Sequence, residues 1–451
     1  MLRGYARSFL TDETGGGTIM GLLWFILLVG ITGMAVDVTD AFRNRTMLQA
    51  TADAAALAGA IDLRNDAAVV AAAVAYSAEN MGTEINGSVL DPADVHIGLW
   101  DAATQSLDTA SAFPDAVMVT VHRSAANANA LPVNFLRIIG LQTWNVVSQA
   151  VAQRFIPDCL RDGLIAREIV DMSSNNGFVN EICIHGEQGV DIQSNNYFET
   201  GVNVSMPNMG MLEIPASGMD SNIGLHDALR ENHLDPRMVN HITEITDAFL
   251  AMNPLSISAQ TTAVMPSYID MTKEVIVTDN RFNFAAAIPH RVYHVQCQPM
   301  RNLVLPAGIL LDKIVLIADC QITIGANSTV TDSVLISRSG PTPGGNDNLN
   351  IGDANITVAA GVQLGKPDNC AEGGGVQLFS NATIHTASST NIDGVQMVAL
   401  GDIFLGARDM GVNGISAQAG GTIKMTSNNM FGLCSGGVGG LFTVPYYRLV
   451  M

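Results

Sequence analysis

Six cysteines are the residues of this sequence whose chemistry is simplest to specify. All of them lie beyond the first third of the chain, and none forms a CxxC pair, which argues against a zinc site. An even, dispersed set favours disulfides in an oxidising compartment, with six free thiols in a cytosolic protein as the alternative. The residues are Cys159, Cys183, Cys297, Cys320, Cys370 and Cys434.

Histidines could bind a metal only if the fold brought their rings together. His290 and His294 are four residues apart, but PHRVYHVQC predicts a strand. In a strand this spacing separates them by about 13 Å on one face. His226, His233 and His241 flank a predicted helix break, and none has another at the spacing of one helical turn. We therefore expect surface histidines, with no metal and no cofactor.

Carboxylate and arginine pairs could support cleavage of a polysaccharide. The candidates are Asp279 with Arg281 and Arg408 with Asp409. Isolated pairs of this kind are usually surface ion pairs. No GxSxG, Walker loop, HExxH or dinucleotide fingerprint occurs in the sequence. We therefore assign no catalytic residue.

The charge balance excludes one class of partner. The formal net charge is -20 at pH 7, and no basic cluster with interleaved aromatic residues occurs. Such a chain repels phosphate backbones, so we expect no nucleic acid partner. The 43 glycines and many short Val/Ile/Thr segments favour β-structure with frequent turns.

One apolar run near the N-terminus could anchor the chain in a membrane. Residues 18–36 carry no charge. As a helix they are long enough to cross about 30 Å of hydrocarbon. We expect a transmembrane helix there and a cytoplasmic segment at 1–17. A cleaved export signal is the alternative, since Gly33-Met34-Ala35 has small residues at cleavage spacing. The centre of the anchor is Leu22, Leu23, Trp24, Phe25, Ile26, Leu27, Leu28 and Val29.

Strong helix formers follow the apolar run, and no proline occurs between it and Pro92. We predict that the helix leaves the membrane and continues as an amphipathic helix over 37–81. A narrow stripe of small and apolar residues recurs at helical spacing. The stripe could bind a partner helix or pack in the chain's own core, and both interpretations stay open. Its residues are Val38, Phe42, Leu48, Ala52, Ala55 and Ala56.

The order of these features resembles a known family. Asp12 and Glu13 precede the apolar span, Asp37 follows it, and LQATADAAALAGA occupies 48–60. This order resembles the TadG-like proteins of the TadE/TadG-like group, which belong to the tight-adherence (Tad, Flp) pilus assembly system. The resemblance implies a single-pass protein of the bacterial inner membrane with a periplasmic or exported body. It also implies contacts with the pilin, pseudopilins and inner-membrane platform of that system.

A small module is expected after the amphipathic helix, over 82–156. VHIGLW, VMVTVHR and VVSQAVA alternate as half-buried strands, and LPVNFLRIIG contains a short helix. The segments from Val117 to Ala152 resemble the membrane-proximal part of the same family. A long helix packed on such a sheet gives a pilin-like α/β module.

The rest of the chain contains near-repeats. MSSNNGF, IQSNNYF and MTSNNMF share a Ser-Asn-Asn core, and asparagine tolerates the left-handed backbone of a tight corner. Short alternating strands continue almost to the C-terminus. We predict a large all-β region over 157–451, a right-handed parallel β-helix with stacked amides at its corners. A β-sandwich is the alternative, and residues 225–252 are expected to insert a helical hairpin.

Stacked coils also suggest how the cysteines pair. Neighbouring coils lie about 4.8 Å apart, close to the Cα separation that a disulfide accepts. Cys159 and Cys183, like Cys297 and Cys320, are about one coil apart in sequence, which leaves Cys370 with Cys434.

Two functions compete on these grounds. The first is a non-catalytic, membrane-anchored pilus assembly or minor pilin-like protein of the Tad system that acts by protein contacts. The second is a membrane-tethered β-helix polysaccharide lyase or hydrolase.

Overall fold

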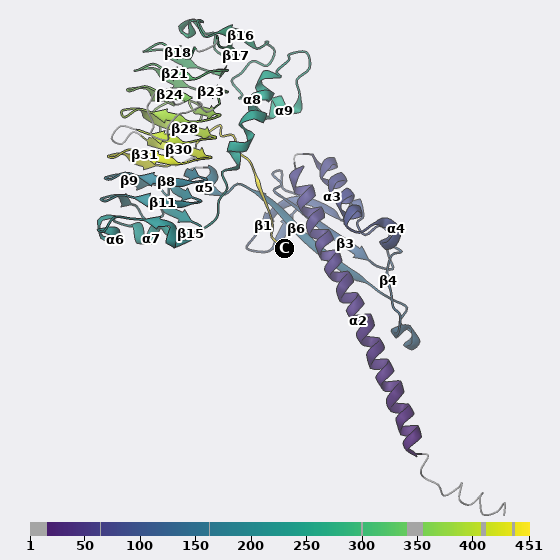
Figure 1. The fold of residues 1–451 in the computed structure, drawn as a ribbon. Helices are drawn as coiled ribbons and strands as arrows, with labels where there is room; N and C mark the ends of the chain where they lie inside the picture. Colours follow the sequence, from purple (N-terminus) through teal and green to yellow (C-terminus); the bar gives the residue numbers. More distant parts are fainter. Residues whose placement is uncertain are drawn as a thin grey trace, which may run out of the picture. The chain divides into compact units, whose positions relative to one another are not determined.

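The computed structural model describes residues 16–63, 65–161, 163–298, 301–340, 355–406, 412–434 and 438–451. The chain forms two compact units (Figure 1). The first contains the residues up to Phe155 together with Pro445–Met451, and the second contains Ile156–Val444. The β-region was predicted to continue to residue 451, and this boundary was wrong, because the last residues return to the first unit.

Helix α2 (Gly16–Ile61) begins the first unit and has 46 residues. At the rise of an α-helix this length corresponds to roughly 70 Å. The helix is long and apolar enough to cross a membrane, with a mean hydropathy of 2.4 in its most apolar window. The large side chains of the predicted anchor are solvent-exposed, as lipid-facing residues would be. A long apolar N-terminal helix is therefore confirmed.

The single helix predicted over 37–81 is instead two helices. The chain turns after Ile61, and α3 (Asp66–Asn80) begins behind Asn65, whose side chain accepts a hydrogen bond from the Ala68 amide. An asparagine cap satisfies a free amide of the first turn and starts a new helix at that point. The prediction weighed helix formers and the absence of proline, and it missed this cap.

The two helices cover one face of an antiparallel sheet with the order β2-β1-β3-β6-β33. Its strands are β1 (Val95–Asp101), β2 (Ser106–Asp108), β3 (Ala116–Arg123), β6 (Val146–Phe155) and β33 (Tyr446–Leu449). The predicted strands over VHIGLW, VMVTVHR and VVSQAVA are all present. The short elements of this unit are α4 (Thr83–Asn86), η2 (Pro92–Asp94), β4 (Leu131–Pro132), η3 (Leu136–Ile139) and β5 (Thr143–Trp144).

The second unit is built on two sheets of 17 and 9 strands, and within the described residues their strands pair in parallel. The predicted β-rich region with parallel sheets is confirmed. The larger sheet contains β7 (Gly163–Ala166), β9 (Gly177–Val179), β10 (Cys183–Gly186), β12 (Tyr197–Phe198), β13 (Asn203–Met206), β15 (Leu229–Glu231), β16 (Ile276–Asp279), β17 (Arg291–Gln296), β19 (Leu310–Asp312), β20 (Ile314–Ala318), β22 (Thr329–Thr331), β23 (Ser333–Ser337), β25 (Gln363–Leu364), β26 (Val376–Ser380), β28 (Asn391–Ala399), β30 (Val412–Ala419) and β32 (Met430–Gly432).

The smaller sheet contains β8 (Ile169–Met172), β11 (Gly189–Ile192), β14 (Leu212–Glu213), β18 (Leu303–Leu305), β21 (Ile322–Ile324), β24 (Ile356–Val358), β27 (Ile384–Thr386), β29 (Ile403–Leu405) and β31 (Ile423–Met425). One apolar core contains side chains from both sheets, such as Leu316 of β20 and Ile322 of β21. Strands such as β20 are buried along their whole length, which explains their continuous apolar sequence. Short helical elements between the strands are α5 (Asp158–Arg161), η4 (Met209–Met211), α6 (Gly218–Ser221) and η6 (Phe284–Ala286).

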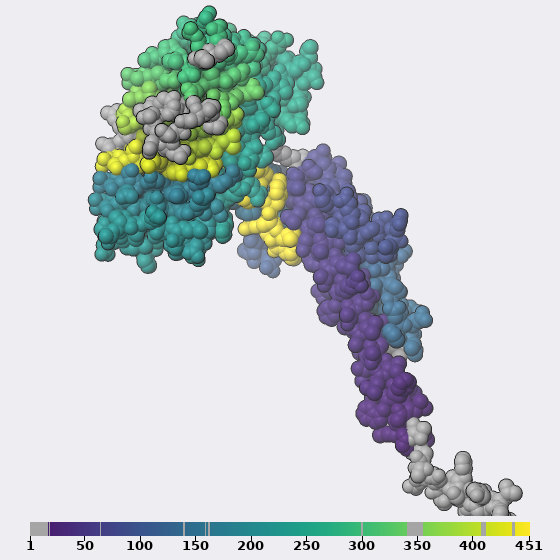
Figure 2. All heavy atoms as spheres, viewed as in Figure 1, coloured from purple at the N-terminus to yellow at the C-terminus, as the bar shows by residue number. Residues whose placement is uncertain are grey.

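The stack of strands does not follow the chain from one end to the other. The first strand, β7, pairs with β10 on one side and with β30, near the C-terminus, on the other. Figure 2 shows the result as a yellow band of C-terminal residues next to the teal residues of the first strands. We call the β7–β30 pairing the junction. It joins the stack of the unit's first strands, which begins at β7, to the stack of its later strands, which contains β30.

A segment outside the sheets connects the two stacks. It contains η5 (Arg237–His241), α8 (Ile242–Leu250) and α9 (Ala259–Val264). Phe249 of α8 packs in a cluster with residues of β17, β20, β23, β26 and β28. The helical hairpin predicted over 225–252 was therefore displaced. The start of this range forms the short helix α7 (Leu225–Ala228) and then the strand β15, which pairs with β13. The helical pair is instead α8 and α9, and it ends at Val264.

The Ser-Asn-Asn repeats form neighbouring corners of the stack. The first asparagine of each pair, Asn175, Asn195 and Asn428, has a left-handed backbone, as the sequence predicts. The second asparagines form a ladder. The backbone N–H of Asn429 donates to the side-chain Oδ1 of Asn176, and the backbone N–H of Asn176 donates to the side-chain Oδ1 of Asn196. The predicted asparagine corners therefore lie next to one another, and the hydrogen bond between Asn429 and Asn176 crosses the junction.

The six cysteines are joined as Cys159–Cys183, Cys297–Cys320 and Cys370–Cys434. The coil spacing predicts the first two of these pairs, and elimination leaves the third. Their Cα separations are 5.1 Å, 5.9 Å and 5.7 Å respectively. Such separations are typical of bonded cysteines and place each pair on neighbouring parts of the stack.

Candidate interaction surface

The predicted partner stripe on α2 divides into a buried part and an exposed part. Four of its residues have no exposed surface and pack against Val117, Val119 and Val121 of β3. Small side chains there allow the helix to approach the sheet closely, so this part belongs to the chain's own core. The four residues are Leu48, Ala52, Ala55 and Ala56.

The exposed part of the stripe lines a groove. Val38 and Phe42 lie on one side, and the segment from Trp144 to Val147 lies on the other. The groove has a volume of about 590 Å³, and its helical side also includes Ala41 and Arg45. The Phe42 side chain is 66% exposed. Such exposure is unusual for a large aromatic residue without a partner.

The sequence missed the β-strand side of this groove. The periodicity of α2 identified Val38 and Phe42, but Trp144 lies far along the chain and meets them only through the pairing of β6 with β3. A groove of mixed polarity, with an aromatic residue on each side and one arginine, has the composition of a protein-binding surface.

A buried carboxylate fixes the end of the apolar span to the sheet unit. Asp37 is only 3% exposed, and its two oxygens accept hydrogen bonds from the amides of Asn134, Phe135 and Leu136 at 2.9, 2.9 and 2.7 Å. The Leu136 amide begins η3 and the other two directly precede it, so the carboxylate binds the N-terminal end of this short helix. Asp37 was part of the family pattern, but its hydrogen-bond partners could not be inferred from the sequence.

A second polar cluster resembles catalytic chemistry and lies in the second unit. His185 Nδ1 lies 2.9 Å from Ser205 Oγ, and His185 Nε2 lies 2.9 Å from Glu187 Oε2. Both His185 and Ser205 have no exposed surface. A serine nucleophile must reach its substrate, so this group cross-links β10 and β13 rather than attacking an ester or glycoside.

The buried histidine predicts a pH dependence of stability. Burial lowers the pKa of His185, although the Glu187 carboxylate opposes this shift. As pH falls below about 6.5, the unfolded chain therefore binds a proton that the folded chain does not, and stability decreases by at most about 1.4 kcal/mol per pH unit. We expect the Tm of the full-length protein in detergent to fall between pH 7.5 and 5.5.

The contribution of His185 can be isolated with two variants. His185→Gln should flatten this part of the pH profile, whereas His226→Gln, at a side chain that is 88% exposed, should leave it unchanged. An equal pH profile in His185→Gln and the wild type would contradict the assignment.

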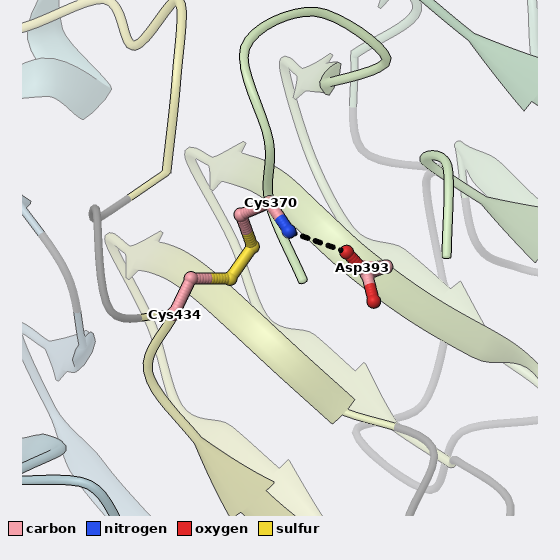
Figure 3. Close-up of side chains that lie close together, drawn as sticks. All are labelled: Cys370, Asp393 and Cys434. Atoms are coloured by element: carbon pink, nitrogen blue, oxygen red, sulfur yellow. Dashed lines mark hydrogen bonds between the residues drawn. A yellow bond between two sulfur atoms is a disulfide. The ribbon is translucent and has the colours of Figure 1, made fainter. Parts of the chain in front are cut away.

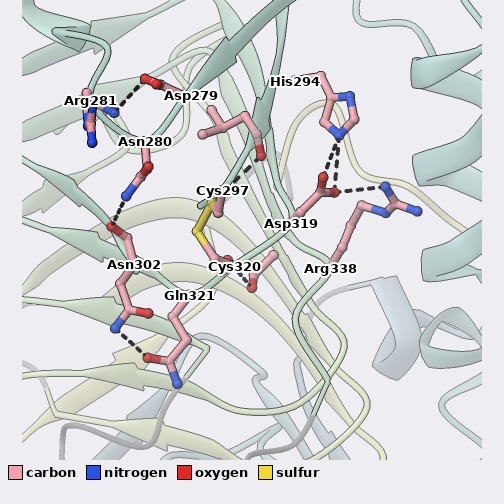
Figure 4. Close-up of a disulfide and its surroundings, with 12 residues drawn as sticks. Asp279, Asn280, Arg281, His294, Cys297, Asn302, Asp319, Cys320, Gln321 and Arg338 are labelled. Atoms are coloured by element: carbon pink, nitrogen blue, oxygen red, sulfur yellow. Dashed lines mark hydrogen bonds and ion pairs between the residues drawn. A yellow bond between two sulfur atoms is a disulfide. The ribbon is translucent and has the colours of Figure 1, made fainter. Parts of the chain in front are cut away.

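The carboxylate and arginine pair Asp279 and Arg281 forms a local turn (Figure 4). The Arg281 amide donates to Asp279 Oδ1 at 2.9 Å, and the guanidinium donates to Gln298 Oε1 at 3.1 Å. These contacts hold both side chains to the chain's own loops. The other pair, Arg408 and Asp409, lies outside the described residues.

The histidines singled out above contact separate groups. His290 precedes β17 and contacts the Tyr268 carbonyl, whereas His294 lies 3.1 Å from Asp319, which also binds Arg338 (Figure 4). His226, His233 and His241 pair with Asp227, Glu187 and Glu244 respectively. The structure therefore does not bring either group of histidines together on one ion.

Among the described residues, one group of three potential metal-binding side chains converges: Cys370, Asp393 and Cys434 (Figure 3). Its two sulfurs are bonded to each other. The Asp393 carboxylate accepts a hydrogen bond from the Cys370 amide at 3.1 Å. The cluster is therefore a disulfide with a capping carboxylate, because a disulfide offers no thiolate to a metal.

Family models match residues in both units. Residues 163–435, more than half of the chain, match the family model described as a domain of unknown function, DUF7867. The chain belongs to the DUF7867 family. In this DUF7867 protein, residues 15–62 also match a model for TadE/G-like Flp pilus-assembly proteins, and residues 48–152 match one for Tad-like Flp pilus assembly. The predicted resemblance to TadG-like proteins of the Tad pilus system is confirmed.

The two Tad matches cover α2 and the sheet through most of β6, and so include every residue of the groove. No curated protein and no solved structure matches this DUF7867 protein. Its relation to the Tad system therefore rests on the unit that carries α2 and the groove.

Proposed function

We propose that this protein is a non-catalytic, membrane-anchored component of Tad pilus assembly that acts through protein contacts. The observation that carries the proposal is that both Tad matches fall on the helix and sheet that line the groove. In this role α2 anchors the chain in the inner membrane, and the groove binds another component of the system, namely the pilin, a pseudopilin or the inner-membrane platform.

The second unit is, in this proposal, a right-handed parallel β-helix on the periplasmic or exported side. Parallel pairing throughout the two sheets supports stacked coils, and so does the ladder contact between Asn176 and Asn196, whose positions differ by 20. The three disulfides support an oxidising compartment, where they form and persist. A stack of this kind is a stiff extension for reaching a pilus outside the membrane.

Photo-cross-linking in living cells tests the contact. A benzophenone amino acid at position 42 of the full chain should cross-link to a Tad component that mass spectrometry identifies. The same group at Leu48, which has no exposed surface, should not cross-link to another protein, so it is the matched control. Cross-links from position 42 to lipid alone, or to no Tad protein, would refute the proposed contact.

A further inference from the structure

The segment between β4 and β5 exposes apolar side chains beside the anchor helix. We call Asn134–Leu141 the hairpin loop; it contains η3. Ile138 is 81% exposed, Phe135 43% and Leu141 39%. Three large apolar side chains on one short loop would be unfavourable in water, since each loses the benefit of burial.

The hairpin loop is held against the last turns of the apolar span. Gly33 lies within the span, and a Cβ atom added to it would lie 2.7 Å from Phe135 Cβ. Asp37, one turn later, accepts the three amide hydrogen bonds of Asn134, Phe135 and Leu136. Gly33 is three residues inside the end of the span, so Phe135 lies roughly 5 Å below that end.

The side chains around the loop match a membrane interface. Met34 and Val36 of α2 are 50% and 45% exposed and continue the apolar surface. Arg137, on the loop itself, is exposed and can extend to lipid phosphates, and Trp144 follows on β5. Interfacial elements place their apolar side about 5–10 Å into the boundary between headgroups and acyl chains, which agrees with the depth of Phe135.

We propose that the hairpin loop is a second membrane contact, with Phe135, Ile138 and Leu141 inserted in the leaflet from which α2 emerges. This inference rests on the membrane anchor of the proposed function. Two contacts, bonded to each other through Asp37, restrict the tilt of the first unit in a way that a single helix cannot. The partner is the lipid leaflet, because the loop is fixed at the depth of a lipid-facing helix.

Depth-dependent quenching tests the proposal on the full chain. A small fluorescent amino acid is introduced at position 27, 138 or 113, one at a time, and the protein is reconstituted in phosphatidylethanolamine and phosphatidylglycerol vesicles containing nitroxide-labelled lipid. Position 27 reports the span. Phe113 is the control, because it is 82% exposed but lies far from the apolar span. It precedes β3, and Val117 of that strand lies next to Gly59, far along α2 from Gly33.

The account predicts strong quenching at positions 27 and 138, several-fold above that at 113, in chains that keep the wild-type Tm. Quenching at 27 but not at 138 would overturn the second contact and leave the anchor intact. Absence of quenching at 27 would overturn the anchor and the loop contact together. A photo-cross-linker at 138 should capture phospholipid, and exclusive capture of a protein would also overturn the inference.

Discussion

Replacing Asn176 with alanine is expected to destabilise the second unit by about 3 kcal/mol, equivalent to a Tm decrease of about 6–12 °C. The side chain is 2% exposed and accepts the Asn429 amide across the junction, while its own Nδ2 donates to the Ser173 carbonyl at 2.9 Å. Alanine would leave the buried amide and the carbonyl without these partners. Thermal unfolding of the full chain in detergent, followed by circular dichroism, measures the change.

Asn175→Gly is the matched control for this experiment. Asn175 is the preceding residue and is exposed. Its backbone is left-handed, with φ 62 degrees. Glycine adopts this conformation without strain, so we expect the Tm of the variant to stay close to that of the wild type. Equal Tm decreases in the two variants, or an unchanged Tm in Asn176→Ala, would show that the ladder does not stabilise the junction.

Replacing Asp37 with alanine is expected to release the hairpin loop from α2. The carboxylate accepts three amide hydrogen bonds, and charged acceptors form the stronger hydrogen bonds of proteins. Hydrogen exchange at the amides of Asn134, Phe135 and Leu136 should accelerate on the order of 100-fold in the full chain. Peptide-resolved hydrogen exchange followed by mass spectrometry measures this.

Asp40→Ala removes the same charge from the same helix. Asp40 Oδ1 accepts a hydrogen bond from Asn44 of the same helix. Exchange in the hairpin loop should therefore stay at its wild-type rate in Asp40→Ala. If Asp37→Ala leaves those amides as protected as before, then the carboxylate does not hold the loop.

Local features of this fold could be predicted because their cause is local. The left-handed Asn175, Asn195 and Asn428 follow from the ability of asparagine to adopt that conformation, and repetition of the motif implied neighbouring corners. The Cys159–Cys183 and Cys297–Cys320 pairs follow from a spacing of one coil. The break after Ile61 was missed, although the Asn65 cap that causes it is also local.

The order of the strands could not be predicted from the sequence. β30 pairs with β7, and Asn429 binds Asn176, which is far from it in the sequence, because the second unit begins in the middle of its own stack. Nothing in the spacing of the repeats indicates which coils meet in this way. The pairing of β33 with β6 could not be predicted either, since a strand of four residues carries no signal of a distant partner.

Only the helical side of the candidate site could be predicted from the sequence. Helical periodicity placed Val38, Phe42 and the alanines on one stripe, but it could not separate the residues that pack on β3 from those that face solvent. That separation depends on where α2 leaves the sheet, which only the tertiary structure defines. The place of Trp144 in the groove and the hydrogen bonds of Asp37 also depend on contacts between residues that are far apart in the sequence.

The most direct test of the central claim is the number of surface Tad pili on cells that lack this protein. Deletion of its gene should abolish them, the full-length chain should restore them, and a Phe42→Asp variant at wild-type abundance should fail to do so. Normal piliation of the deletion strain would contradict a role in Tad pilus assembly.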